Sequence, residues 1–163
     1  MKRSILFIIF LTWFYPVLSQ NNRVKFHAQM GILHQVDKNY PNNDLGVKGG
    51  FGVYRQMNFG MLGLEGDLIH LSDKESENDF AGFSYSVKIN LLFKTWAIRD
   101  RHLYLGPGVG VFGSFSNPGV TNGYSFKALY PIQIAKMPMY LGYDFDLNLF
   151  GYYRNSLGLS YWF

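Results

Sequence analysis

The chain has 163 residues, of which 48% are apolar and 18% aromatic, and its formal net charge is +4. This length allows a single domain, and the absence of cysteine excludes disulfides, a thiolate nucleophile and cysteine-ligated metal centres. A mean hydropathy near zero together with so many aromatic residues is unusual both for a soluble domain and for a helical membrane protein.

Residues 1–19 have the pattern of a secretory signal peptide. Lys2 and Arg3 precede an apolar stretch at 5–18, and Ser19 is a small residue at the expected cleavage position. A permanent membrane anchor is the alternative, but a spanning helix needs roughly 20 apolar residues. We therefore expect cleavage near Ser19 and one mature domain covering 20–163. Removal of the two cations lowers the net charge to +2, and no Lys/Arg run favours nucleic-acid binding.

Apolar and polar residues alternate with a period of two in eight successive segments, which predicts an all-β chain. The expected strands lie at 24–33, 45–53, 62–68, 83–93, 103–111, 124–133, 141–149 and 156–163. Long polar connections are expected at 35–44, 71–79 and 114–123, and tight turns at 55–58 and 135–138. The connection at 94–101 is too long for this scheme.

Eight such segments predict an eight-stranded antiparallel up-and-down transmembrane β-barrel, in which roughly 9 to 11 residues of each strand cross the bilayer. A soluble barrel or sandwich would alternate too, but it would expose more charge than the 16% present here. A lipid-facing barrel turns its apolar face outward and closes on itself to satisfy its backbone groups. Aromatic residues near strand ends are then expected to form a girdle at one rim: Phe59, Phe93, Trp96, Tyr140, Tyr161 and Phe163.

The last eight residues combine Ser156 and Gly158 with the aromatic residues Tyr161 and Phe163. This segment resembles the terminal strand signal of Gram-negative outer-membrane proteins. Together with the signal peptide and the length, it makes the mature chain similar to the small eight-stranded outer-membrane β-barrels of the OmpA/OmpX-like type. The resemblance implies integral location in the outer membrane, contact with its lipids, and recognition of the last strand by the barrel-assembly machinery. Because members range from adhesion to lipid modification, it does not fix an activity.

The polar face of such a barrel points inward, so charges of both signs meet in the lumen. The expected network comprises Lys48, Glu65, Asp67, Lys88, Lys127, Asp144, Asp146 and Arg154. Counting from the turns places Lys48 opposite Gly66 and Lys127 opposite Asp146, with Arg154 on the other side of Asp146. Because side chains fill the interior of an eight-stranded barrel, we expect a self-neutralised plug, with a charged conduit as the alternative.

A G-x-G-x-x-G sequence begins at Gly108, but a turn at 114–119 follows it where a dinucleotide site needs a helix, and Gln133 stands near the position of the required acid. The period-two glycines Gly106, Gly108 and Gly110 instead indicate space for side chains from other strands.

The four histidines show no metal-ligand spacing, so neither a metal nor a cofactor is expected. His70 and Ser72 share one face at the end of a strand, and Glu75 and Glu77 follow, a set that would suit deacylation of an outer-leaflet lipid. This element resembles the His-x-Ser-Asn sequence of outer-membrane lipid A deacylases, but Asp73 replaces the Asn.

The favoured function is a non-enzymatic barrel that serves envelope integrity or presents surface loops to a partner protein. The deacylase and a narrow channel are the alternatives.

Overall fold

The computed structural model describes residues 24–37, 43–72, 82–115, 119–149 and 151–163. It contains eight strands, which confirms the all-β prediction: β1 Val24–Asp37, β2 Asn43–Met57, β3 Gly60–Leu71, β4 Phe83–Ile98, β5 Arg101–Ser114, β6 Val120–Ile134, β7 Met137–Asn148 and β8 Tyr152–Trp162. None of the described residues forms a helix long and apolar enough to span a membrane. The expected signal peptide at 1–19 lies outside the described residues.

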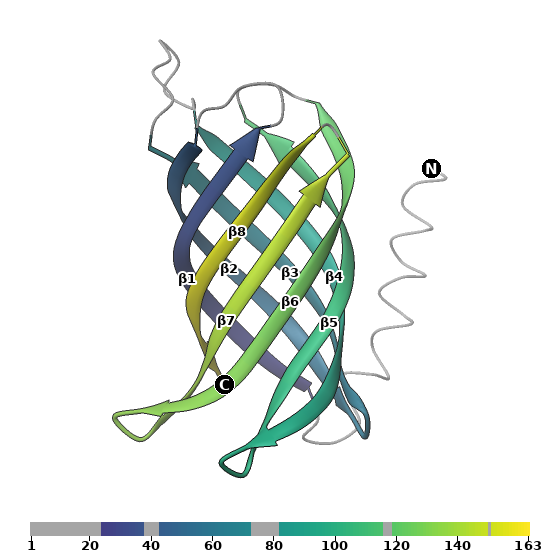
Figure 1. Ribbon diagram of the computed structural model, residues 1–163, viewed down its shortest axis with the longest axis vertical. Helices are drawn as coiled ribbons and strands as arrows, with labels where there is room; N and C mark the ends of the chain where they lie inside the picture. The colour runs from purple at the N-terminus through teal and green to yellow at the C-terminus, as the bar shows by residue number, and fades with distance from the viewer. Residues whose placement is uncertain (1–23, 38–42, 73–81, 116–118, 150) are drawn as a thin grey trace, which may run out of the picture.

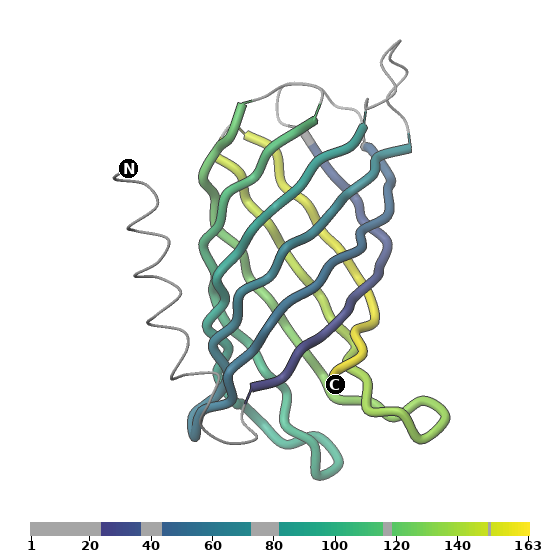
Figure 2. Tube along the Cα trace, turned by 180° about the vertical axis from the view of Figure 1, so that it is seen from behind, coloured from purple at the N-terminus to yellow at the C-terminus, as the bar shows by residue number. Residues whose placement is uncertain are grey.

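The strands form one closed antiparallel barrel in which each pairs with its neighbours in sequence and β1 pairs with β8 (Figure 1). At the turn end of the β1–β8 pair, two backbone hydrogen bonds complete the closure. Phe26 N–H donates to the Phe163 carbonyl oxygen at 3.0 Å, and Phe163 N–H donates to the Phe26 carbonyl oxygen at 2.9 Å. Figure 2 shows the barrel from behind, with the first and last described residues at the end that carries the β2–β3, β4–β5 and β6–β7 turns. We call this end the turn rim and the opposite end the loop rim. A closed barrel leaves no strand edge unpaired.

The exposure of side chains is inverted relative to that of a soluble protein. Met30 and Phe51 on the outer face are each 72% exposed, whereas Lys88 and Lys127 on the inner face are each 1% exposed. Period-two alternation produces this separation, because successive side chains of a strand point to opposite faces of the sheet. The predicted phase, polar inward and apolar outward, is confirmed.

Two hairpins, β4–β5 and β6–β7, project beyond the barrel at the turn rim (Figure 1). Their tips are two-residue turns with positive φ at both positions: 50° and 65° at Arg99 and Asp100, and 50° and 68° at Ala135 and Lys136. The expectation of a long connection at 94–101 is therefore wrong, because β4 continues to Ile98 before this tight turn. A register shift between positions 94 and 97 bulges the strand and breaks the alternation there.

The predicted partner of Lys48 is wrong by three residues. Lys48 lies opposite Ile69 rather than Gly66. The reason is the position of the β2–β3 turn: Met57 pairs with Gly60, so the turn is centred after Met57 and not on it.

The predicted partner of Lys127 is wrong as well. Lys127 lies opposite Asp144, and Asp146 lies opposite Ser125 on one side and Arg154 on the other. The β6–β7 turn is centred one residue earlier than the pattern suggested, which shifts the pairing by two positions. A shift by two positions leaves each side chain on the same face of the sheet, so the side chains predicted to face the lumen still do.

Candidate functional site

Seven charged side chains form a continuous series of ion pairs inside the barrel, alternating in sign. All seven are at most 5% exposed, and they come from β2, β3, β4, β6 and β7. In order, the series runs Glu65, Lys127, Asp144, Lys48, Asp67, Lys88 and Asp146. Three of its six contacts join non-adjacent strands, namely Glu65–Lys127, Asp144–Lys48 and Lys88–Asp146, so the series connects opposite walls of the lumen.

Lys127 occupies the first junction of this series. Its Nζ lies 2.7 Å from Glu65 Oε1 and 3.0 Å from Asp144 Oδ1, and it donates to Gln29 Oε1 at 3.3 Å. A buried ammonium is stable only when its charge is paired and its three donors find acceptors. The three acceptors around Lys127 meet that requirement.

Lys48 and Lys88 complete the series. Lys48 Nζ donates to Asp144 and lies 4.0 Å from Asp67 Oδ2. Lys88 Nζ lies 3.0 Å from Asp67 Oδ2 and 3.3 Å from Asp146 Oδ1. Each lysine therefore bridges two carboxylates, and each of the two inner carboxylates bridges two lysines.

Arg154 is buried at 3% exposure, but its direct partners are neutral. Its Nε donates to Gln35 Oε1 at 2.6 Å, its Nη2 donates to Ser84 Oγ at 3.1 Å, and its guanidinium lies 4.7 Å from the centre of the Tyr152 ring. In the β7–β8 register it lies opposite Asp146. With Arg154 included, four cations balance four carboxylates in the described part of the lumen.

Glycines on the facing walls leave room for these long side chains. A Cβ at Gly110 would lie 2.8 Å from Lys88 Cγ, and one at Gly108 would overlap the side chains of Asn90 and Ser125. Both glycines lie inside β5 and not at the start of a helix. This geometry agrees with the spacer interpretation and not with a dinucleotide loop.

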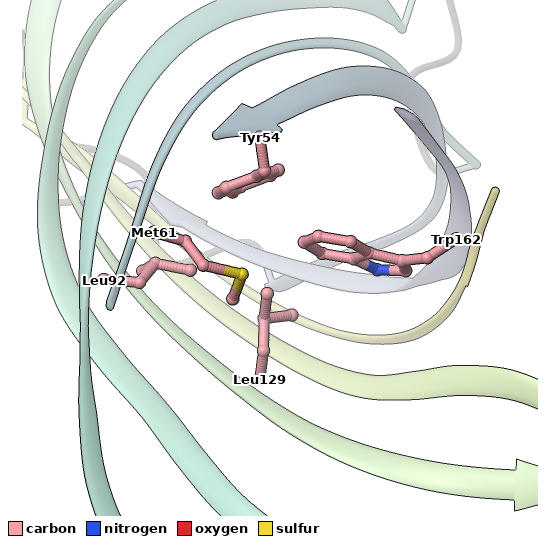
Figure 3. Packing of buried hydrophobic residues seen from close by; sticks show 5 residues of the cluster. All are labelled: Tyr54, Met61, Leu92, Leu129 and Trp162. Atoms are coloured by element: carbon pink, nitrogen blue, oxygen red, sulfur yellow. The ribbon is translucent and has the colours of Figure 1, made fainter. Parts of the chain in front are cut away.

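An apolar layer covers the network on its turn side. Figure 3 shows how the side chains of this layer pack together. Its members are at most 4% exposed: Tyr54, Met61, Leu92, Leu129 and Trp162. The rings of Tyr54 and Trp162 lie 5.0 Å apart, and Tyr54 OH donates to Glu65 Oε1 at 2.8 Å. The phenol therefore joins the apolar layer to the charged one.

This layer is not among the features expected from the sequence, although the sequence contains a signal for it. Tyr54 follows Gly50 and Gly52 in the inward phase, and Trp162 follows Gly158 and Ser160 in the same phase. Every second residue of a strand faces the lumen, so a large apolar residue at the next position of a polar or small inward-facing series must point into the lumen too. The layer could have been predicted by following the inward-facing positions, every second residue, to the end of each strand.

A second apolar group covers the network on its loop side. Leu33, Ile69 and Leu71 are 1–3% exposed and pack together. On β3, Ile69 and Leu71 follow Asp67 toward the loop rim, so the charged layer lies between the two apolar groups. A cavity of about 10 Å³ beside Lys48 and Asp144 offers space for about one water molecule.

The expected aromatic girdle is present in part. Phe59, Trp96 and Phe163 are 52%, 74% and 64% exposed at the turn rim. Tyr140 does not belong to it: its ring lies 4.6 Å from that of Trp162, on the inner face. The expectation for Tyr140 was wrong because this position shares the inward phase of Gly142.

The four residues of the expected assembly signal divide between the two faces of β8. Ser156 is buried on the inner face, and Gly158 lies opposite Gly31, where a Cβ would lie 2.5 Å from the Met30 carbonyl oxygen. Tyr161 and Phe163 lie on the outer face with ring centres 6.1 Å apart. Recognition of this strand by an assembly machinery stays a prediction.

The residues of the alternative catalytic set are not brought together. His70 points outward from β3 and stacks on Phe83, with ring centres 4.4 Å apart. Ser72 Oγ donates to the Leu45 carbonyl oxygen at 2.7 Å, and among the described residues no hydrogen bond joins it to His70. Glu75 and the neighbouring Glu77 lie outside the described residues. The described geometry thus offers Ser72 no general base.

The described residues also contain no group of three or more histidine, aspartate and glutamate side chains able to hold a metal ion.

Solved structures share this architecture. Neisserial surface protein A of Neisseria matches 86% of this chain and 96% of its own, with a TM-score of 0.68 at 10% sequence identity. The fold is that of the small outer-membrane β-barrels. Two structures of the attachment invasion locus protein of Yersinia pestis also match at 17% identity. One, bound to the heparin analogue sucrose octasulfate, covers 86% of this chain and 99% of its own at a TM-score of 0.46, and the other covers 85% and 98% at 0.44.

No protein-family model and no curated protein sequence matches the chain. Similarity at such low identity establishes the fold of the barrel and no activity.

Proposed function

We propose that the mature chain is an integral, non-enzymatic outer-membrane barrel with a closed lumen, which serves envelope integrity or presents its loop rim to a partner protein. The observation that carries this proposal is the buried series of ion pairs enclosed between two apolar groups. An interior filled in this way braces the wall and leaves no room for a solute to pass. Transport and pore formation are then less well supported than a structural or display role.

The outer face supports the membrane location. Its large apolar side chains, such as Phe51 and Met30, are mostly exposed, which is stable in lipid and costly in water. The terminal aromatic strand and the expected signal peptide at 1–19 support the outer membrane in particular. In this arrangement the turn rim faces the periplasm and the loop rim faces outward, because outer-membrane barrels have short periplasmic turns.

The deacylase alternative has no specific observation in its favour, since Ser72 and His70 engage different partners. The channel alternative requires an open path past Lys127 and Lys88, both of which are 1% exposed.

Epitope insertion tests both location and orientation. One variant carries a short epitope between residues 76 and 77, and the other carries it at the β4–β5 turn between Arg99 and Asp100. We expect both proteins in the outer-membrane fraction, migrating faster unboiled than boiled. Antibody should label intact cells for the first variant and only permeabilised cells for the second. Recovery in a soluble periplasmic fraction, or the opposite labelling, would contradict the proposal.

A further inference from the structure

Charges outside the lumen are divided between the two rims. The turn rim and the strand ends next to it carry six cations and one acid: Lys25, Arg55, Lys94, Arg99, Arg101 and Lys136, and Asp100. The sequence segments that join strands at the loop rim, 37–44 and 72–82, contain six acids and two lysines. Because the lumen charges cancel, the barrel is electrically polarised, with its positive end at the turn rim.

We infer that the turn rim binds the headgroups of anionic phospholipids in the leaflet that surrounds it. This inference rests on the proposed membrane location and adds a lipid class to it. Anionic headgroups attract cations that lie within a Debye length, so the turn rim gains from a negative surface and the loop rim does not.

The described residues form no ion pair with the cations of the turn rim. Arg55, Lys94, Arg99 and Lys136 are exposed and make no ion pair with any described residue. Arg101 differs: it donates to the Pro131 carbonyl oxygen at 3.2 Å, a contact that holds the two projecting hairpins together without cancelling its charge. The rim therefore keeps its attraction for an external anion.

A polar recess at the same rim suits a phosphate. Its volume is about 350 Å³, and it is lined by Gln56, Met57, Asn58, Lys94 and Tyr104. Its polar side chains are two amides, an ammonium group and a phenol, all of which can donate hydrogen bonds, and no carboxylate lines it. Hydrogen bonds from a charged donor to an anionic oxygen are the stronger kind, so Lys94 is the expected phosphate contact.

Exposed apolar side chains accompany these cations. Trp96 is 74% exposed, Ile98 49% and Met137 46%, all on or beside the two projecting hairpins. Aromatic and apolar groups interleaved with Lys and Arg are typical of surfaces at the membrane–water interface. A purely charged surface would suit an acidic soluble protein instead, so the combination favours lipid.

Trp96 provides a built-in reporter. Without residues 1–19 the chain has two tryptophans, and Trp162 is 4% exposed inside the lumen. The full mature barrel would be reconstituted in phosphatidylcholine bilayers with a minor fraction of brominated phosphatidylglycerol or, separately, brominated phosphatidylcholine. Both carry bromine close to the headgroup. We expect stronger quenching of Trp96 by the anionic lipid, reflecting about fivefold local enrichment per engaged cation, and a smaller difference at high salt.

Two variants identify the cause. Arg55→Gln/Lys94→Gln/Arg99→Gln/Lys136→Gln removes the four exposed, unpaired cations, the expected phosphate contact included, and should sharply reduce the preference. Lys38→Gln/Lys74→Gln, in the segments that join strands at the loop rim, should leave it unchanged. Equal quenching by both lipids in an inserted wild-type barrel would overturn the inference, would point to an acidic protein as the occupant, and would leave the membrane location intact. Failure of the refolded barrel to insert would instead overturn the proposed function and this inference with it.

Discussion

Lys127 joins two carboxylates from different strands of the lumen. It reaches from β6 to Glu65 on β3 and to Asp144 on β7, so one side chain ties three strands together. Burying charges in this way costs solvation free energy, which the pairing offsets only while every partner is present. Removing one member therefore matters more than the net contribution of the intact network suggests.

Lys127→Met should destabilise the barrel by about 3–5 kcal/mol, because Glu65 and Asp144 each lose a cation while side-chain volume is kept. The measurement is the urea midpoint for unfolding from lipid vesicles. The control Lys136→Met, at an exposed turn, should change stability by less than about 0.5 kcal/mol. Equal midpoints for the two variants would show that the lumen charges are not coupled.

Asp146→Asn should cost less than Lys127→Met in the same assay. Asp146 pairs with Lys88 alone within 4 Å, and Lys88 keeps Asp67 as a partner at 3.0 Å. An effect of Asp146→Asn equal to or larger than that of Lys127→Met would contradict this ordering and would indicate that Arg154 depends on Asp146.

Ser72→Ala tests the hydrolase alternative because it removes Ser72 Oγ, the candidate nucleophile. The substitution removes the hydrogen bond from Ser72 Oγ to the Leu45 carbonyl and nothing else that the described residues show. We expect the outer-membrane lipids to keep the same acyl chains by mass spectrometry in cells carrying wild type, the variant or neither. A missing acyl chain that depends on wild-type Ser72 would establish the hydrolase.

The strands show which part of the fold could be predicted from sequence and which could not. The alternation of apolar and polar residues specified the number of strands. It also specified which residues face the lumen, because successive side chains can point only to the inner or the outer face. Register depends on turn chemistry, and the tips at Arg99–Asp100 and Ala135–Lys136 place residues with Cβ atoms at positive φ where Gly or Asn would have been the recognisable signal. The turn at Ala135–Lys136 is why Lys127 was placed two residues away from its true partner. Lys48 was placed three residues away because the β2–β3 turn is centred after Met57 and not on it.

The last strand carries the assembly prediction. Phe163→Ala keeps the two backbone hydrogen bonds to Phe26 and removes the ring contacts to Phe26 and Tyr161. If the terminal aromatic is a recognition signal, the amount of assembled barrel in cells should fall severalfold, while refolding into lipid from urea changes by about 1 kcal/mol or less.

Phe115→Ala is the matched control for that variant. Phe115 is also exposed and packs edge-on against Tyr85, with ring centres 5.3 Å apart, but at the loop rim. It should leave cellular assembly near the wild-type amount. Unchanged assembly of Phe163→Ala, or an equal loss in both variants, would remove the signal interpretation.

The whole molecule combines an apolar exterior, a balanced charged interior and two unlike rims. The number of positive and negative side chains inside the barrel could be predicted from sequence, because these residues occupy the inward-facing positions of the alternating pattern. Their closure by Tyr54 and Trp162 on one side and Ile69 on the other could not, since it depends on which strands face each other across the lumen. Under the proposed function, these layers seal the barrel and let it support its loop rim.

Electrical recording across a planar bilayer tests this central claim most directly. The purified wild-type barrel, shown to be inserted by its faster migration before boiling, is held under an applied voltage while current is measured. A lumen sealed by the ion-pair series and its two apolar layers should give no unitary conductance steps above those of protein-free bilayers. Reproducible ion-conducting steps from the wild type would contradict the closed lumen.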